Sequence, residues 1–168
     1  MRESVSVCFV CLGNICRSPT AEGVFRALVE ADGLSDRIAI DSAGTAAYHS
    51  GQSADRRSRM FARQRGIELD SIARQFVKED FDRFDYVLAL DLQNLSELRD
   101  LRGDEFARET HLGLLRDFDP TAASGSSVPD PYYGGEAGFL EVFEQCQRAC
   151  QGLLQYLKTQ VLADASPR

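Results

Sequence analysis

Short apolar stretches alternate with segments of helical periodicity along the chain, and this alternation is the feature that most constrains the fold. Four stretches have the length and apolar content of buried strands: 4–11, 38–42, 85–90 and 111–115. Helical patterns separate or follow them. Such alternation is typical of a parallel sheet with helices on both faces. For a chain of 168 residues we therefore expect one α/β domain with a four-stranded parallel sheet.

Capping residues and glycines predict the helix boundaries. We expect the first helix to start at Pro19, with Ser18 as its N-cap, and to end near Gly33. A second, basic helix is predicted between a cap at Ser53 and Gly66.

The later helices follow the same logic. Asp91 is placed to cap the third helix, and the last helix is predicted over about residues 136–157. Its apolar stripe, interpreted as core, comprises Phe139, Val142, Phe143, Cys146, Cys150, Leu153 and Leu157. The single domain (1–168) is expected to have its core over about 5–158, with 159–168 as a frayed tail.

Charge and composition narrow the possible partners and the compartment. The net charge of −7 argues against broad binding to nucleic acid or to anionic membranes. No apolar run approaches the length of a membrane span, and no signal peptide is recognised, so a cytoplasmic protein is predicted. The odd number of cysteines, five, does not suggest a disulfide framework. With only His49 and His111, no metal site is expected.

The stretch "CLGNICRS", residues 11–18, has the residue types of an anion-binding loop. Gly13 and Asn14 tolerate positive φ, so the chain can curl tightly between a strand and a helix. A curled loop that leads into a helix points its amides inward. Arg17 adds a planar fork that holds two oxygens at once. The sequence therefore predicts a phosphate-binding loop between the first strand and the first helix.

Cys11 lies at the base of this loop. The inward amides, the helix start and Arg17 all favour a thiolate there, and a thiolate beneath a bound phosphoryl group can attack it in line. Ser18 can donate a hydrogen bond to the sulfur and so stabilise it as a leaving group. We interpret Cys11 as a nucleophile.

Four segments together resemble the low-molecular-weight protein tyrosine phosphatases. They are "VCLGNICRSPTAEGVF" at the first strand, "DSAGT" (41–45), "ARQFVKEDFDRFDYVLALD" (73–91) and "DPYYGG" (130–135). The resemblance covers roughly residues 5–158. It implies hydrolysis of phosphotyrosine in proteins through a phosphocysteine intermediate, without metal or cofactor, by an enzyme that we expect to be monomeric.

The resemblance also implies residue roles. Cys11 would be the nucleophile, Arg17 the phosphate clamp and Asp130 the general acid and base. The phosphate would bind within residues Leu12, Gly13, Asn14, Ile15, Cys16, Arg17 and Ser18. Asn14, Ser18 and Ser42 would brace this loop. The pocket would be walled by Ile15, Tyr48, Tyr132 and Tyr133. Cys16 would form a reversible disulfide with Cys11 that protects it from over-oxidation.

Asp130 also has a chemical rationale of its own. A tyrosyl oxygen leaves far more easily when it is protonated, and a carboxylic acid over the pocket contributes about 10²–10⁴-fold. Pro129 and Pro131 restrict the backbone around it. Asp117 and Asp119 on the same predicted loop are the rival candidates.

Three other functions remain open at this point. An arsenate reductase coupled to thioredoxin shares such a loop but needs further cysteines, and none lies between Phe76 and Arg108. Phosphoarginine phosphatases have a loop that resembles residues 11–18, but with threonine at the position of Ile15. A non-catalytic phosphotyrosine-binding module is the third.

The sequence departs from the family pattern at two places. Ser71 stands where many members have a histidine, and Ala89-Leu90 stand where many members have Cys-Met.

Overall fold

A single parallel sheet forms the centre of the computed structural model, which describes residues 1–106 and 108–164. The strand order is β2-β1-β3-β4. The bounds of the strands are β1 Val5–Cys11, β2 Ile38–Gly44, β3 Tyr86–Ala89 and β4 His111–Leu114. All neighbouring strands run parallel. The predicted α/β fold with a four-stranded parallel sheet is confirmed.

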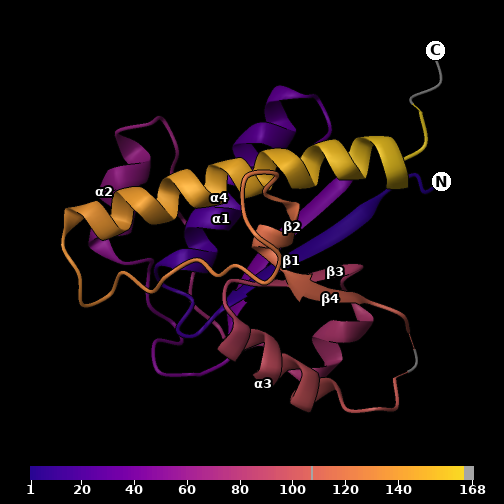
Figure 1. The fold of residues 1–168 in the computed structure, drawn as a ribbon, viewed down its shortest axis with the longest axis horizontal. Coiled ribbons are helices and arrows are strands. Elements are labelled where there is room, and N and C mark those ends of the chain that lie inside the picture. The colour runs from indigo at the N-terminus through magenta and orange to yellow at the C-terminus, as the bar shows by residue number, and fades with distance from the viewer. Residues whose placement is uncertain (107, 165–168) are drawn as a thin grey trace.

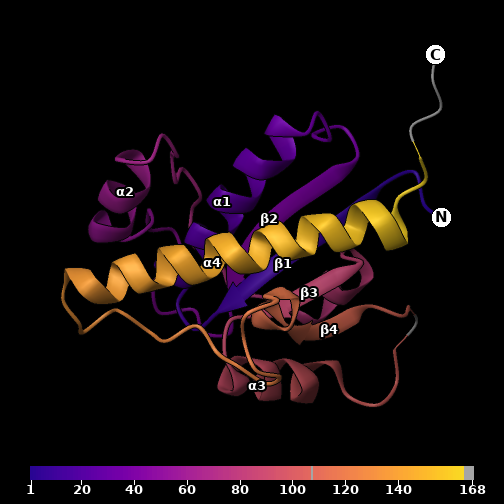
Figure 2. The ribbon, with the colours of Figure 1, turned by 45° about the horizontal axis from the view of Figure 1, so that its top comes forward.

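Helices cover both faces of this sheet (Figures 1 and 2). The α-helices in the described residues are α1 Arg17–Ala31, α2 Arg56–Arg63, α3 Leu92–Arg102 and α4 Glu136–Tyr156. Helices α1 and α4 pack together on one face, whereas α3 and the short helix η1 (Lys78–Asp82) lie on the other. Helix α2 lies beyond the sheet, beside the start of α4 (Figure 1).

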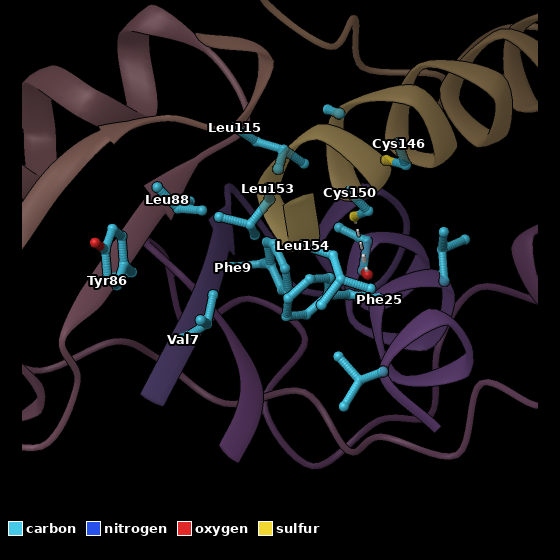
Figure 3. Packing of buried hydrophobic residues seen from close by; sticks show 14 of the residues in the cluster. Val7, Phe9, Phe25, Tyr86, Leu88, Leu115, Cys146, Cys150, Leu153 and Leu154 are labelled. Carbon is cyan, nitrogen blue, oxygen red and sulfur yellow. Dashed lines mark hydrogen bonds between the residues drawn. The ribbon is translucent and has the colours of Figure 1, made fainter. Parts of the chain in front are cut away.

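Alternate residues of β1 build the two cores. Val7 and Phe9 point toward α1 and α4, whereas Cys8 and Val10 point toward α3 and η1. The Phe9 and Phe25 rings meet edge to face with their centroids 5.6 Å apart. Figure 3 shows how α4 closes this side over the two rings, with residues that include Cys146, Cys150, Leu153 and Leu154. The prediction that both cysteines belong to the core is confirmed.

Two helix starts differ from the sequence prediction. Helix α1 begins at Arg17, so Ser18 lies inside it and is not an N-cap. The reason is that the Ser18 hydroxyl bonds to Cys11 instead. Helix α2 begins after Asp55, whose carboxylate accepts from the Arg57 amide at 2.8 Å, so the expected cap at Ser53 is wrong.

Helix α2 ends at Arg63, three residues before Gly66, which has φ +77°. The prediction for Asp91 is confirmed, because its carboxylate accepts a hydrogen bond from the Asn94 amide at 2.7 Å at the start of α3. A carboxylate is the natural cap there because it both accepts this bond and faces the positive end of the helix.

The C-terminal segment is ordered further than expected. A π-helical turn, η3 (Leu157–Val161), continues α4, and Leu162 is 2% exposed in the core. Leu162 also bridges to Arg2, which places the N-terminal segment beside the chain that follows η3 (Figure 1). A frayed tail from 159 is therefore wrong for residues 159–162, and 165–168 lie outside the described residues. Among the described helices, none has the length and apolar character that crossing a bilayer requires.

The strand order sets where a ligand site forms. After β1 the chain passes through α1 to β2 on one side, whereas β3 pairs with β1 on the other side. Ligands of open α/β sheets bind at such a switch point, outside the carboxyl ends of the strands. Here the ends of β1 and β3 lead to Cys11 and Asp91, respectively.

Candidate active site

The loop that joins β1 to α1, residues 11–18, curls around the sulfur of Cys11. Asn14 has φ +57°, the left-handed conformation that the sequence predicted here. Its amide donates to Cys11 Sγ at 3.3 Å. Cys11 itself is 3% exposed and lies at the base of a cavity. The loop therefore presents the sulfur of Cys11, already a hydrogen-bond acceptor, at the base of this cavity.

Asn14 is the central brace of this loop. Its Nδ2 donates to Ser18 Oγ at 2.8 Å and to Ser42 Oγ at 2.9 Å. Its Oδ1 accepts from the Arg74 amide at 3.1 Å. Both N–H bonds and the carbonyl oxygen of the buried side chain thus have partners, which stabilises the strained backbone of the curl. The structure brings together Asn14, Ser18 and Ser42 as the sequence predicted.

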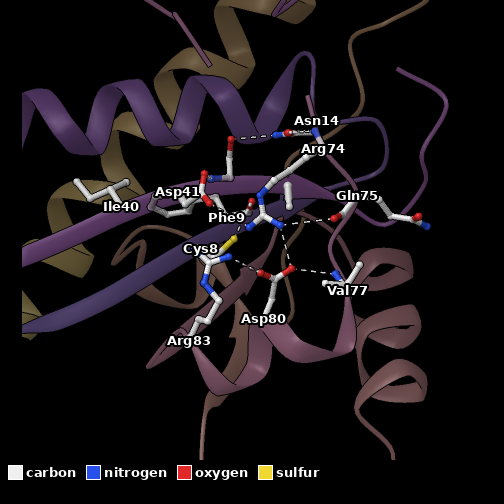
Figure 4. A network of polar contacts seen from close by, with 12 residues as sticks. Cys8, Phe9, Asn14, Ile40, Asp41, Arg74, Gln75, Val77, Asp80 and Arg83 are labelled. Carbon is white, nitrogen blue, oxygen red and sulfur yellow. Dashed lines mark hydrogen bonds and ion pairs between the residues drawn. The ribbon is translucent and has the colours of Figure 1, made fainter. Parts of the chain in front are cut away.

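Arg74 ties this brace to the rest of the sheet (Figure 4). Its guanidinium bonds to Asp80 Oδ2 at 2.9 Å and to Asp41 Oδ2 at 3.0 Å. Asp80 is 1% exposed and also accepts from the Val77 amide at 2.9 Å. In the described structure, the segment that holds Ser71 contacts the loop through the amide of Arg74.

Ser18 lies directly beside the nucleophile candidate. Its Oγ is 3.0 Å from Cys11 Sγ and 3.3 Å from the Ala43 carbonyl oxygen. Asn14 already donates to this oxygen, so the hydroxyl keeps its own proton for one of those two acceptors. A thiolate at Cys11 would be the stronger of the two acceptors, and Ser18 would then donate to the sulfur.

Arg17 is buried at the first position of α1. Its Nη1 donates to Asp91 Oδ2 at 2.6 Å and to the Val128 carbonyl at 3.1 Å. Burial opposes the charge, but Cys11 and Asp91 outweigh it and raise the pKa of the guanidinium above its ordinary value. Arg17 is thus fixed in direction and always charged.

The role of Asp91 at this site was missed by sequence reasoning. One carboxylate oxygen caps α3 and the other holds Arg17, so a single residue orients both. A usable signal existed: an aspartate directly after β3, the strand beside β1, at the carboxyl edge where ligands of such sheets bind.

Asp130 lies over the cavity on the loop of residues 117–135. Its Oδ2 is 3.6 Å from Arg17 Nη2, and its side chain is 44% exposed. The Tyr132 amide donates to Asp130 Oδ1 at 3.0 Å. The loop is anchored just before it, where the Val128 amide donates to the Leu90 carbonyl at 2.7 Å.

The two rival aspartates lie elsewhere. Asp119 is 3% exposed and accepts from the amide and hydroxyl of Thr121, so it holds the loop rather than facing the cavity. Asp117 belongs to the short helix η2 (Leu115–Phe118) and does not line the cavity. Of the three candidates, Asp130 alone faces the sulfur's cavity.

The cavity has a volume of about 170 Å³ and gathers nearly every predicted site residue. Its lining comprises Cys11, Leu12, Gly13, Ile15, Cys16, Arg17, Tyr48, His49, Asp130, Tyr132 and Tyr133. Asn14, Ser18 and Ser42 lie beneath, as the braces. Tyr132 and Tyr133 meet edge to face with centroids 4.9 Å apart, and Tyr133 is 96% exposed. An aromatic ring fits such a wall.

His49 is a lining residue that sequence reasoning did not select. Its Nδ1 lies 3.1 Å from Gln52 Oε1, and its ring centroid lies 6.0 Å from that of Tyr132. A Cβ on Gly13 would come within 2.9 Å of the His49 ring, so this contact favours glycine at position 13. The signal was its place next to Tyr48, in the loop after β2.

Cys16 lines the same cavity. Burial raises the pKa of its thiol to about 12, so it is protonated at neutral pH. Neither Cys11 nor Cys16 is in a disulfide in this structure. The predicted Cys11–Cys16 disulfide stays a prediction. In the described part of the chain, no cluster of three or more His, Cys, Asp or Glu has the arrangement of a metal site.

Known proteins resemble this chain over most of its length. The model of the family described as "Low molecular weight phosphotyrosine protein phosphatase" matches residues 6–163. A "Low molecular weight protein-tyrosine-phosphatase" of Streptomyces coelicolor is 49% identical over 156 residues, which are 92% of this chain and 94% of that protein.

Solved structures agree with this match. A protein tyrosine phosphatase from Entamoeba histolytica, crystallised with Hepes in the active site, has a TM-score of 0.85 at 42% identity and covers 92% of this chain and 97% of its own. A drosophila arginine phosphatase has a TM-score of 0.85 at 31% identity and covers 92% and 98%. The chain belongs to the low molecular weight phosphotyrosine protein phosphatase family.

Proposed function

We propose that this phosphatase hydrolyses phosphotyrosine in proteins, with Cys11 as nucleophile, Arg17 as phosphate clamp and Asp130 as general acid and base. The observation that carries the proposal is the arrangement around one cavity. A sulfur bonded by an amide and a hydroxyl lies at its base, and a buried arginine and an exposed carboxylate lie 3.6 Å apart beside it.

The first step transfers the phosphoryl group to sulfur. The phosphate oxygens accept hydrogen bonds from the loop amides and from Arg17, which positions phosphorus above Cys11 Sγ. The thiolate attacks phosphorus, a phosphorus–sulfur bond forms, and the bond to the tyrosyl oxygen breaks. Asp130 gives its proton to that oxygen, so tyrosine leaves as a neutral phenol.

The second step returns the enzyme to its starting state. Asp130, now a carboxylate, takes a proton from a water molecule that attacks the phosphorus of the phosphocysteine. The phosphorus–sulfur bond breaks, and the electron pair returns to Cys11 as a thiolate. Ser18, whose hydroxyl lies 3.0 Å from the sulfur, donates a hydrogen bond that stabilises this leaving group.

The substrate assignment rests on the walls of the cavity. Ile15, Tyr48 and Tyr132 surround the entrance with apolar and aromatic surface, which suits the ring of phosphotyrosine. The likeness to the drosophila arginine phosphatase keeps phosphoarginine as the second candidate. The monomeric state and cytoplasmic location predicted from the sequence stay predictions.

A panel of phosphopeptides tests the proposal. Three peptides of one sequence carry phosphotyrosine, phosphoarginine or phosphoserine at the same position, and phosphate release is measured for each. We expect phosphotyrosine to be hydrolysed with the highest kcat/KM. A higher kcat/KM for phosphoarginine would overturn the substrate assignment, and arsenate reduction measured in parallel would point to the reductase instead.

A further inference from the structure

Helix α2 and the two residues after it concentrate positive charge in a chain that is acidic overall. Five arginines lie within residues 56–65, at positions 56, 57, 59, 63 and 65, whereas the chain has a net charge of −7. No aspartate or glutamate lies within this segment. A local excess of one sign against an opposite net charge creates a local field that attracts the opposite charge.

Three of these arginines share one face of the helix. Arg56, Arg59 and Arg63 follow the spacing i, i+3, i+7, which places them in line along α2; we call them the arginine patch. Among the described residues, Arg56 and Arg59 have no carboxylate within 4.0 Å, and Arg59 Nε donates to the Ala54 carbonyl at 3.0 Å. Their remaining guanidinium nitrogens are available to a ligand.

The third member, Arg63, contacts Glu68 at 3.1 Å, with both side chains about two-thirds exposed. An ion pair this exposed contributes little to stability, and the arginine can exchange its partner for another carboxylate. The arginine patch is therefore largely uncompensated, with Arg56 and Arg63 exposed and Arg59 half-buried.

The start of α2 adjoins the active-site cavity. The Asp55 amide donates to the carbonyl of Ile15, a cavity residue, at 2.8 Å. Arg57 Nη2 donates to the carbonyl of Tyr132 at 2.8 Å, and its guanidinium lies 5.7 Å from the centre of that ring. A polypeptide held at the cavity thus has α2 as its immediate neighbour.

A groove continues from this contact between α2 and the start of α4, which lie side by side in both ribbon views (Figures 1 and 2). Its volume is about 110 Å³, and it is lined by Arg57, Met60, Phe61, Gln64, Glu136 and Phe139. Met60 is 49% exposed at its rim. The arginine patch is not part of this groove's lining; it lies on the adjoining face of α2, which a longer peptide held at the cavity would reach.

We propose that the arginine patch binds acidic residues that flank phosphotyrosine, so that the enzyme selects acidic segments of its protein substrates. The inference rests on the proposed function, because it concerns how that substrate is held. A guanidinium pairs with a carboxylate through two parallel hydrogen bonds, and it does so without losing its charge. The net charge of −7 disfavours nucleic acid or an anionic membrane as the occupant instead.

Matched peptides test this preference. Phosphotyrosine peptides carry three glutamates or three glutamines, placed before or after the phosphotyrosine. With each exposed ion pair worth about two- to fivefold, we expect kcat/KM to be about tenfold higher for an acidic peptide than for its neutral counterpart. The difference should shrink in about 0.5 M salt, since exposed charges are screened. Equal values for both peptides would overturn the inference.

Substitutions assign the preference to the patch. The double variant Arg56→Gln/Arg59→Gln should lose most of the preference for acidic peptides, and Arg56→Glu/Arg59→Glu should favour peptides with lysines instead. The matched control is Arg99→Gln. Arg99 is an exposed arginine of α3 without an ion pair among the described residues, and this variant should keep the preference for acidic peptides. A preference that survives both double variants would contradict the proposal.

Hydrolysis of p-nitrophenyl phosphate separates this inference from the proposed function. That substrate has no flanking residues, so all variants should match the wild type on it. If the wild type hydrolyses p-nitrophenyl phosphate but shows no preference for acidic peptides, the role proposed for the arginine patch is refuted and the proposed function is not. Binding to vesicles of anionic lipid without a preference for acidic peptides would refute that role as well. A wild type that does not hydrolyse p-nitrophenyl phosphate refutes the proposed function.

Discussion

The two loops that meet over the cavity are built in opposite ways. The β1–α1 loop is buried and bonded throughout: Asn14 is 1% exposed, Ser18 is fully buried, and each contacts several fixed partners. The 117–135 loop carries Asp130, which is 44% exposed and lies 3.6 Å from Arg17. The phosphate has a constant tetrahedral shape, so a rigid cradle such as the β1–α1 loop suits its binding. Leaving groups vary in shape, so a general acid on a more exposed loop suits them.

Among the substitutions that test this contrast, a change of Cys11 should have the largest effect on turnover. Cys11→Ser replaces a thiolate with a neutral hydroxyl of much lower reactivity, so we expect turnover of p-nitrophenyl phosphate to fall by at least about 10⁴-fold. Inorganic phosphate should still bind, because the amides and Arg17 remain. Near wild-type turnover would refute the mechanism, and lost phosphate binding, measured by calorimetry, would refute the rigid cradle.

The acid loop should produce a smaller effect that depends on the substrate. Asp130→Ala removes the proton donor, and we expect a loss of about 10²–10³-fold for phosphotyrosine. For aryl phosphates whose leaving groups need no proton, the loss should be much smaller. Rates are compared across a series of leaving groups. Equal losses along the series would exclude Asp130 as the acid.

Substitutions in the two loops should also differ in their effect on the free energy of unfolding. Asn14→Ala removes two buried hydrogen bonds and one part-buried hydrogen bond at a residue with positive φ, and we expect a loss of about 3 kcal/mol in the free energy of unfolding. Ser126→Ala removes an exposed hydrogen bond to the Ala123 carbonyl in the 117–135 loop and should change it by about 0.5 kcal/mol or less. Urea denaturation measures both. Similar losses would contradict the contrast.

Metal removal is predicted to have no effect at all, because both loops supply their charges from side chains and amides. Activity on p-nitrophenyl phosphate should be unchanged after incubation with EDTA. A loss that a divalent cation restores would show that the cradle is incomplete without a metal.

The sequence predicted what local patterns encode. The apolar runs predicted the strands and their parallel arrangement, and Gly13-Asn14 predicted the tight curl, which the positive φ of Asn14 confirms. It failed where a tertiary contact outweighed a local preference. Ser18 has the character of a helix cap, yet its hydroxyl bonds to Cys11 because the folded loop brings the sulfur within 3.0 Å.

Other details depended on packing that no local pattern reports. The second oxygen of Asp91 meets Arg17 only because β1 and β3 are neighbours in the sheet. His49 reaches the cavity because Gly13 leaves room for its ring. Leu162 is ordered because it fills the core beside the N-terminus, although the sequence around it is typical of a tail.

Trapping the covalent intermediate tests the central claim most directly. The Asp130→Ala variant should accumulate it with a good leaving group, because the second step lacks its base. After acid quench and proteolysis, mass spectrometry locates the phosphoryl group. We predict a phosphocysteine at Cys11, absent in Cys11→Ser. Rapid turnover without any phosphorylated cysteine, or a phosphoryl group on another residue, would contradict the account.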